Sequence, residues 1–249
     1  MAYIIHSDFA QYEVFMKRLK RLTAILIFLC AFFMLALLFI IYRDGYFNSL
    51  YRKVNSVPYS YSSNAQYTQR ESMFEMSPVK KADIIFVGDS ITARAEWQEY
   101  YPDRIVLNRG IDSDVTEGVY NRLDTIIEKK PSELYLMIGI NDIRQGIDRA
   151  VTLNFYAKIL DRLTAELPDC TIYVQSVLPV NSSTGIDNKD VAALNTSIQA
   201  LAGERSLTYI DVYSGLIDEN GDLPSEYSID GVHMTGAGYQ IWLDTLKNK

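Results

Sequence analysis

The chain is poor in the residues that cross-link small proteins or bind transition metals. Its 249 residues include two cysteines, Cys30 and Cys170, and two histidines, His6 and His233. Two cysteines exclude a disulfide framework, and two cysteines with two histidines are too few for a zinc site of the usual kind. The sequence therefore predicts neither a disulfide scaffold nor a metal site.

Positive charge is also scarce. The chain has 24 Lys and Arg against 31 Asp and Glu, a net charge of −7 at neutral pH. A protein that binds nucleic acid without sequence preference needs a basic face, so nucleic acid is excluded as a partner. Apolar residues make up 48% and charged residues 22%, which indicates a folded globular protein and argues against disorder.

One long apolar run stands apart from this average composition. Residues 22–42 hold Thr23 as the only clearly polar side chain before the terminal tyrosine. A helix of this length is about 31 Å long, which matches a hydrocarbon core of about 30 Å. The sequence therefore predicts one transmembrane helix over 22–42.

Basic residues predict the orientation of this helix. Four lysines and arginines lie within 17–21, whereas Arg43 alone follows the run immediately. The positive-inside rule then places 1–21 in the cytoplasm and the body of the chain outside it. A cleaved signal peptide is the alternative, but its apolar region is about 7–15 residues long and ends in small residues. We expect an uncleaved signal anchor in a single-pass protein of the cell membrane.

The rest of the chain divides into a connector over 43–63, rich in Tyr, Ser and Asn, and a body over 64–249. The expected strands of the body are 83–87, 104–107, 133–138, 171–177 and 208–212, and its expected helices are 64–76, 115–129, 150–167, 189–205 and 235–246. Strands that alternate with helices indicate βαβ units. We therefore expect an α/β domain whose parallel sheet is covered on both faces.

Polar turns follow the expected strands. They are Gly88-Asp89-Ser90, Asn108-Arg109-Gly110 and Gly139-Ile140-Asn141-Asp142, with Asp230-Gly231-Val232-His233 before the last helix. Open α/β sheets bind ligands beyond the carboxyl ends of their strands. The sequence therefore places the functional site at this edge.

One histidine can serve the body of the chain as a base. His6 precedes the predicted membrane helix, so Ser-His chemistry would need His233. Asp230 lies three residues earlier, where its carboxylate could accept from one ring nitrogen while the other faces a serine. The candidate nucleophile is Ser90, which follows the first expected strand. The plainer interpretations are a surface histidine and a helix N-cap serine.

Donors for an oxyanion hole are present at the same edge. The backbone N–H groups of Ser90 and Gly110 and the side-chain amide of Asn141 are the candidates. Alternatively, Gly110 supplies a positive φ and Asn141 caps a helix. Structural roles are expected for the remaining aspartates at the strand ends, which are Asp89, Asp142 and Asp211.

Taken together, the four polar blocks resemble the GDSL, or SGNH, hydrolase family over roughly 65–249. The stretches FVGDSIT, IGINDI, VQSVLPVN and DGVHMTGAGYQIW are similar to the subgroup of platelet-activating-factor acetylhydrolase α-subunits and bacterial O-acetylesterases. The resemblance implies a flavodoxin-like three-layer α/β/α sandwich with a five-stranded parallel sheet. Many relatives carry a second glycine a few residues after the glycine that corresponds to Gly110. This chain has Ser113 in that segment, which should narrow the conformational freedom of the loop.

The resemblance also implies a reaction. Ser90 would be the nucleophile, His233 the base and Asp230 its orienting carboxylate, with the oxyanion held by Ser90, Gly110 and Asn141. No metal or cofactor is needed. The expected substrate is an O-acyl, foremost O-acetyl, ester of a carbohydrate or cell-envelope glycan. The alternatives are a lysophospholipase or other lipid acylhydrolase and a catalytically silent glycan-binding domain. No oligomeric state follows from the sequence.

Overall fold

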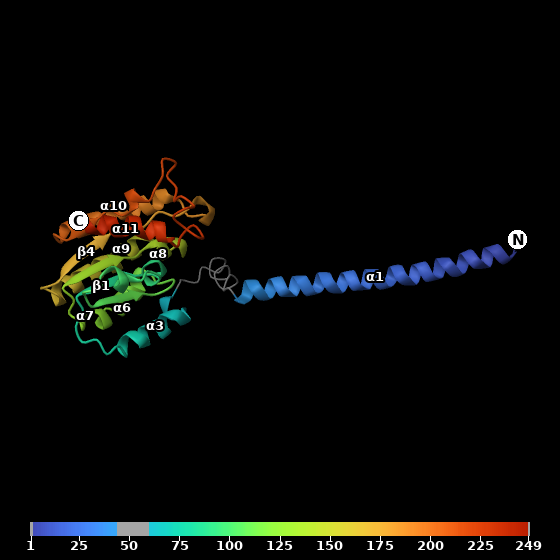
Figure 1. Cartoon of the computed structure of the whole chain (residues 1–249), viewed down its shortest axis with the longest axis horizontal. Coiled ribbons are helices and arrows are strands. Elements are labelled where there is room, and N and C mark those ends of the chain that lie inside the picture. Colours follow the sequence, from blue (N-terminus) through green and yellow to red (C-terminus); the bar gives the residue numbers. More distant parts are fainter. Residues whose placement is uncertain (1, 44–59, 249) are drawn as a thin grey trace. The chain divides into compact units, whose positions relative to one another are not determined.

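The computed structural model describes the backbone of residues 2–43 and 60–248, and the side chains of 16–36 and 60–248. Two compact units are distinguished, Met1–Pro58 and Tyr59–Lys249. The first unit contains helix α1, Ala2–Arg43 (Figure 1). Most of the predicted connector, 44–59, lies outside the described residues.

Helix α1 contains an apolar stretch long enough to cross a membrane. Among the described side chains this stretch is Met16–Ala36, with a mean hydropathy of 2.1, and none of it is buried. It overlaps the predicted span 22–42, whose last six side chains lie outside the described residues. Helix α1 is therefore a candidate membrane span.

The second unit is built on a five-stranded parallel sheet. The strands are β1 Ile84–Gly88, β2 Val106–Gly110, β3 Glu133–Met137, β4 Thr171–Gln175 and β5 Thr208–Ile210. Their order in the sheet is β2-β1-β3-β4-β5, with every neighbouring pair parallel. This is the strand order of a flavodoxin-like fold, so the predicted fold class is confirmed.

Helices connect the strands (Figure 1). They are α3 Ala65–Glu75, α4 Ser90–Ala93, α5 Trp97–Tyr100, α6 Thr116–Asn121, α7 Asp124–Ile127, α8 Ile140–Arg144, α9 Arg149–Glu166, α10 Asn188–Glu204 and α11 Gly236–Lys247. Three 3-10 turns, η1 Tyr61–Ser63, η2 Ser182–Thr184 and η3 Tyr213–Gly215, complete the described elements. The long helices α9, α10 and α11 lie within one or two residues of their predicted positions.

The two faces of the sheet bury different side chains. The register aligns Phe86, Tyr135 and Tyr173 across β1, β3 and β4, where they stack on one another. Trp97 of α5 stacks on Phe86, and Trp242 of α11 packs edge-on against Trp97. Alternate strand residues point to the opposite face, and these are also fully buried. Both faces are therefore covered, as expected for a three-layer arrangement.

The predicted helix 115–129 is wrong, because the chain breaks it into α6 and α7. Arg122, between them, has φ −108° and ψ 15°, outside the helical region. Arg122 N and Leu123 N bond three residues back, to the carbonyls of Val119 and Tyr120, at 3.3 and 3.5 Å. The Arg122 side chain turns into the core, a tertiary contact that helical periodicity does not reveal.

The second strand also begins and ends later than predicted. Ile105 N donates to the Asp83 carboxylate instead of joining the ladder, and β2 continues to Gly110, in register with Gly88. The Asn108-Arg109-Gly110 block is therefore the end of a strand and not a loop after it.

Candidate active site

Strands β2, β1 and β3 end side by side. Gly88 at the end of β1 is in register with Gly110 of β2 and Met137 of β3. The turns that follow start from one edge of the sheet, which is where open α/β sheets bind ligands. The polar blocks that the sequence predicts to meet do lie at this edge.

Ser90 is the first residue of α4 and follows β1 through a tight turn. The Asp89 carboxylate accepts a hydrogen bond from Ile91 N at 2.9 Å, so Asp89 caps the helix. The alternative role of Ser90 as the N-cap is therefore wrong. A Cβ at Gly88 would lie 2.4 Å from the Met137 carbonyl oxygen, so only glycine lets the chain turn this close to β3.

Ser90, His233 and Asp230 form one hydrogen-bonded chain. The Ser90 hydroxyl lies 2.8 Å from His233 Nε2, and His233 Nδ1 lies 2.6 Å from Asp230 Oδ2. The other Asp230 oxygen accepts from the backbone N–H groups of Val232 and His233 at 3.0 and 2.8 Å. The lone histidine of the body is therefore paired at both ring nitrogens, unlike a free surface histidine.

The surroundings of Asp230 keep it ionised. Partial burial works to raise its pKa, but hydrogen bonds from the His233 backbone and ring outweigh burial and hold the pKa at about 2. A carboxylate that stays charged near neutral pH fixes the orientation of the imidazole and stabilises its protonated form. The arrangement can therefore take a proton from Ser90 and hold it on His233.

The three candidate oxyanion donors are not equivalent. Ser90 N opens helix α4, where a helical N–H has no partner four residues back. Asn141 Nδ2 uses one hydrogen on the Asp114 carbonyl at 3.0 Å and has a second to offer. Gly110 N already donates to Asn108 Oδ1 at 2.9 Å, so it can reach an oxyanion only as a shared donor.

Close packing explains the glycine at position 110. A Cβ there would lie 2.3 Å from Ala93 N and 2.7 Å from the Asp89 carbonyl oxygen. Gly110 has no positive φ, so the alternative based on left-handed backbone is wrong. Glycine is required because β2 approaches the turn that carries Ser90.

Asn108, in the second polar block, supports the candidate site through hydrogen bonds that the sequence does not reveal. Its Nδ2 lies 3.0–3.1 Å from the carbonyl oxygens of Thr92, Ala93 and Ala95, at the end of α4 and just after it. Its Oδ1 accepts from Gly110 N. One side chain therefore joins the nucleophile helix to the candidate oxyanion strand.

The remaining aspartates have structural contacts. Asp142 accepts from Thr116 N and from the Thr116 hydroxyl, the latter at 2.6 Å, and so ties α8 to the start of α6. Asp211 accepts from the backbone and hydroxyl of Ser214, as a turn residue does. Within 60–248 and the described part of α1, no group of three or more His, Cys, Asp or Glu is placed to hold a metal ion.

Comparison with known proteins identifies the family. Residues 86–241 match the family model of the GDSL-like lipase/acylhydrolases. The chain belongs to this family. It is also similar to platelet-activating factor acetylhydrolase IB subunit alpha2 of Rattus norvegicus and of Homo sapiens, at 25% identity over 174 residues, covering 64% of this chain and 72% of each relative.

Solved structures agree with this assignment. A protein of Streptococcus pneumonia described as a "platelet activating factor" is 29% identical, with a TM-score of 0.67 over 73% of this chain and 89% of that one. A GDSL-like lipase of Bacteroides thetaiotaomicron shares the fold at 23% identity, TM-score 0.61, over 74% and 96% of the two chains. The acetyl xylan esterase AlAXEase shares it at 20% identity, TM-score 0.57, over 66% and 98%. The protein is therefore an ester hydrolase of the GDSL type, as the sequence predicts.

Proposed function

We propose that this GDSL-type hydrolase is a serine esterase that removes O-acyl groups, foremost O-acetyl groups, from a carbohydrate or cell-envelope glycan. The observation that carries the catalytic part is the chain of two short contacts, 2.8 Å from Ser90 to His233 and 2.6 Å from His233 to Asp230. A nucleophile, a base and an orienting carboxylate within hydrogen-bond reach are what acyl transfer through a serine requires.

In the proposed reaction Ser90 Oγ attacks the ester carbonyl carbon while His233 Nε2 takes the hydroxyl proton. The tetrahedral oxyanion accepts from Ser90 N and from the second hydrogen of Asn141 Nδ2, and Gly110 N serves as a shared donor. His233 then returns its proton to the leaving alcohol. Water, deprotonated by His233, hydrolyses the acyl-enzyme and restores Ser90.

The surroundings of the catalytic loop support a polar substrate. A Cβ built on Gly231 would lie 2.8 Å from Thr184 Cγ2, 3.1 Å from Asn181 Cβ and 3.3 Å from the Ser183 hydroxyl. The segment before α10 therefore packs against the loop that holds Asp230 and His233. Of these contacts the Ser183 hydroxyl belongs to an exposed residue, and a hydroxyl beside the catalytic loop suits a glycan, which must be bound through hydrogen bonds. The fold shared with an acetyl xylan esterase adds to this argument.

A lipid acylhydrolase is the second candidate. Ile229, directly before Asp230, leaves 72% of its surface exposed, which would suit contact with an acyl chain. The name of the platelet-activating factor acetylhydrolase relatives points to the same class of ester. A silent glycan-binding domain is disfavoured, because every candidate catalytic and oxyanion residue is present.

We also propose that the enzyme is anchored in the cell membrane by a single helix. The apolar stretch Met16–Ala36 supports a span that we place at 22–42, with 1–21 cytoplasmic and a connector at 43–63. The hydrolase domain, 64–249, would then face away from the cytoplasm. Protease added to sealed right-side-out vesicles should release the hydrolase domain intact. Release that occurs only after the vesicles are opened would contradict the proposed orientation.

The catalytic proposal is tested with the full-length chain in detergent. Hydrolysis of p-nitrophenyl acetate, butyrate and octanoate is compared with that of the Ser90→Ala and His233→Ala variants. We expect activity that falls with acyl length and is lost in both variants. A maximum at octanoate would favour the lipid candidate, and activity that survives Ser90→Ala would contradict the nucleophile.

A further inference from the structure

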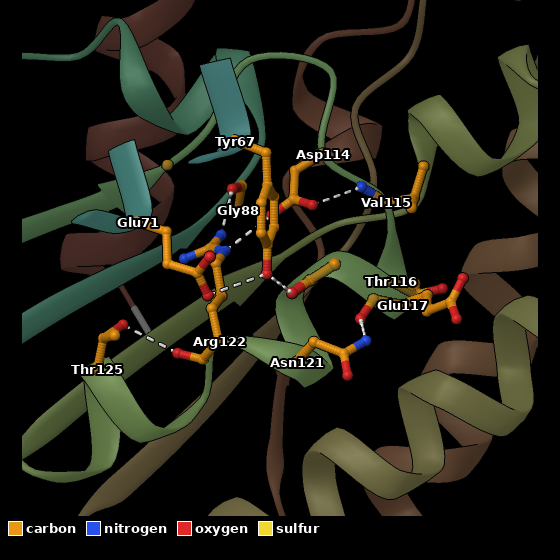
Figure 2. Close-up of polar contacts among 12 residues, drawn as sticks. Tyr67, Glu71, Gly88, Asp114, Val115, Thr116, Glu117, Asn121, Arg122 and Thr125 are labelled. Carbon is orange, nitrogen blue, oxygen red and sulfur yellow. Dashed lines mark hydrogen bonds and ion pairs between the residues drawn. The ribbon is translucent and has the colours of Figure 1, made fainter. Parts of the chain in front are cut away.

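A fully buried ion pair lies beneath the candidate active site. Arg122 Nε donates to Asp114 Oδ2 at 2.8 Å, and neither side chain has any exposed surface (Figure 2). Arg122 comes from the break between α6 and α7, and Asp114 from the loop that follows Gly110 and Ile111. Neither residue belongs to the catalytic chain of Ser90, His233 and Asp230.

Arg122 contacts the turn that carries the nucleophile. Its Nη2 donates to the Gly88 carbonyl oxygen at 3.1 Å, two residues before Ser90 (Figure 2). The same oxygen accepts from Ile111 N, also at 3.1 Å, and Ile111 directly follows Gly110. One carbonyl oxygen at the end of β1 therefore accepts hydrogen bonds both from Arg122 and from the residue that follows β2.

Asp114 contacts the third element of the site. Its carboxylate accepts from Val115 N at 3.0 Å, which fixes the local backbone. Its carbonyl oxygen accepts from Asn141 Nδ2 at 3.0 Å, the bond that orients the amide towards its candidate oxyanion role. The partner of Arg122 thus sets the direction of Asn141.

Helix α3 closes the pair from the other side. The Tyr67 hydroxyl donates to the Gly118 carbonyl at 2.9 Å, and the Phe74 ring centre lies 5.9 Å from Arg122 Cζ. A Cβ on Gly118 would lie 1.9 Å from Asp114 Oδ1, so α6 approaches the carboxylate as only glycine allows. The ion pair is therefore packed against both α3 and α6.

A buried ion pair of this kind needs a reason other than stability. Removing two charges from water costs several kcal/mol per ion, and well-packed apolar side chains are often as stabilising or more so. The specific gain is geometric, because an arginine has several donors in a fixed planar arrangement. Arg122 uses Nη2 for the Gly88 carbonyl, two residues before the nucleophile, and Nε for the carboxylate of Asp114, whose carbonyl orients Asn141, while its buried Nη1 has no hydrogen-bond partner.

We propose that Arg122 is a positioning residue that holds the Ser90 turn and the Asn141 amide at a fixed distance from each other. It acts through the Gly88 carbonyl and through Asp114, and it touches no reacting atom. The inference rests on the proposed serine mechanism, because it assigns Arg122 a role only in the geometry of that site.

The test uses variants of the full-length chain in detergent. The double variant Arg122→Met/Asp114→Asn removes both charges, so that no unpaired charge is left buried. The single variant Arg122→Lys keeps the positive charge but loses the planar set of guanidinium donors. The control is Arg109→Met. Arg109 is also buried, and its Cζ lies 4.5 Å from the centre of the same Phe74 ring, but its Nε and Nη2 have no hydrogen-bond partner and its Nη1 donates to the Asn108 carbonyl at 3.3 Å, not to Gly88 or Asp114.

We expect the double variant to lower kcat for p-nitrophenyl acetate by about 10- to 100-fold, with KM changed by less than about 3-fold, since misplaced donors act on the transition state. In an Asn141→Ala background the same change should lower kcat by only about 3-fold, because the part that acts through Asn141 is already lost and only the part that acts through Gly88 remains. Arg122→Lys should recover part of kcat, and Arg109→Met should leave it within about 2-fold of the parent.

Three results would overturn the inference. They are an unchanged kcat in a folded double variant, a full multiplicative loss on top of Asn141→Ala, and an equal loss in Arg109→Met. Circular dichroism checks folding, and Arg122→Lys serves if the double variant does not fold. If esterase activity survives in Ser90→Ala, the proposed function itself is contradicted. If activity is lost in Ser90→Ala but the Arg122 variants keep the kcat of the parent, only this inference is contradicted.

Discussion

The two halves of the catalytic edge are held in different ways. Ser90, Gly110 and Asn141 form one half, and their supports are bonds between residues far apart in the chain, such as the bond from Arg122 to Gly88. We call this the nucleophile half. The base half is the loop from Ser228 to Met234, where Asp230 and His233 bond mainly to residues two to five positions away.

This difference indicates which groups of the proposed site must be held rigidly for the reaction. Oxyanion donors must be fixed before charge develops, so the nucleophile half is buried and cross-linked. The base needs one orientation of one ring, which a nearby carboxylate can supply, and the Asp230 side chain stays 47% exposed. Substitutions that remove these hydrogen bonds should therefore lower both stability and activity in the nucleophile half, but activity alone in the base half.

The largest expected effect on activity comes from a substitution in the base half. His233→Ala removes the proposed base and should lower kcat by at least about 10³-fold. Its Tm should change by less than about 3 °C, because the loop keeps the Asp230 bonds to backbone N–H groups. Steady-state kinetics and thermal melts check both, and a large fall in Tm would show that the loop is as cross-linked as the other half.

The pKa values of a carboxylate in each half are shifted in opposite directions from the ordinary value of an aspartate. Burial raises the pKa of Asp89 to about 7, although the bond from Ile91 N opposes it, whereas the pKa of Asp230 is about 2. The folded state then holds a proton on Asp89 that the unfolded state has lost above about pH 4. Stability from this group is full below about pH 4 and is lost as the pH rises to about 7.

Asp89→Asn isolates this contribution, because asparagine can still accept from Ile91 N but does not titrate. The contribution is of the order of 4 kcal/mol between these pH values. Urea unfolding from pH 4 to 8 should therefore show a flatter dependence of the free energy of unfolding in the variant. An unchanged slope would contradict the buried, protonated carboxyl.

Asn108→Leu tests the cross-links of the nucleophile half. It leaves the carbonyls of Ala93 and Ala95 without this donor, which should cost about 3 kcal/mol of stability, while the Thr92 carbonyl keeps Trp97 Nε1 as a donor at 2.9 Å. The kcat should fall as well, since Gly110 N loses the acceptor that fixes it. Asn121→Leu, at an exposed position, is the matched control and should change neither quantity. Equal effects in the two variants would remove Asn108 from the support of the site.

The smallest expected effect concerns backbone strain beside the oxyanion loop. Ser113 has φ +60°, in the left-handed region that favours glycine. Ser113→Gly should raise Tm by about 2–4 °C, as relief of about 1 kcal/mol predicts. Ser206→Gly, at φ +56° after α10, should do the same. Only Ser113→Gly should also lower kcat, by about 2- to 5-fold, because it loosens the nucleophile half. A similar kcat in both variants would show that this loop does not limit catalysis.

The sequence was sufficient for the sheet and the long helices, because apolar runs and helical periodicity are local signals. The short helices α4, α5 and α8 have four or five residues, too few to show a period. The break at Arg122 was not predictable, since its cause is a contact with Gly88, 34 positions away.

The candidate site was predicted only in part. Ser90 and His233 lie 143 positions apart, and their contact was expected from the strand-end turns and the single histidine of the body, with the family resemblance as further support. The shared hydrogen bond of Gly110 and the contacts of Asn108 depend on how β2 packs against α4, which no spacing in the sequence encodes.

The most direct test of the serine mechanism is to label the nucleophile. The full-length chain is treated with diethyl p-nitrophenyl phosphate, which an activated serine attacks with release of p-nitrophenol, and is then analysed by intact and peptide mass spectrometry. We predict one diethylphosphoryl group per chain, on Ser90, absent in Ser90→Ala and formed much more slowly in His233→Ala. A group on another residue, or equal labelling of Ser90→Ala, would contradict the mechanism.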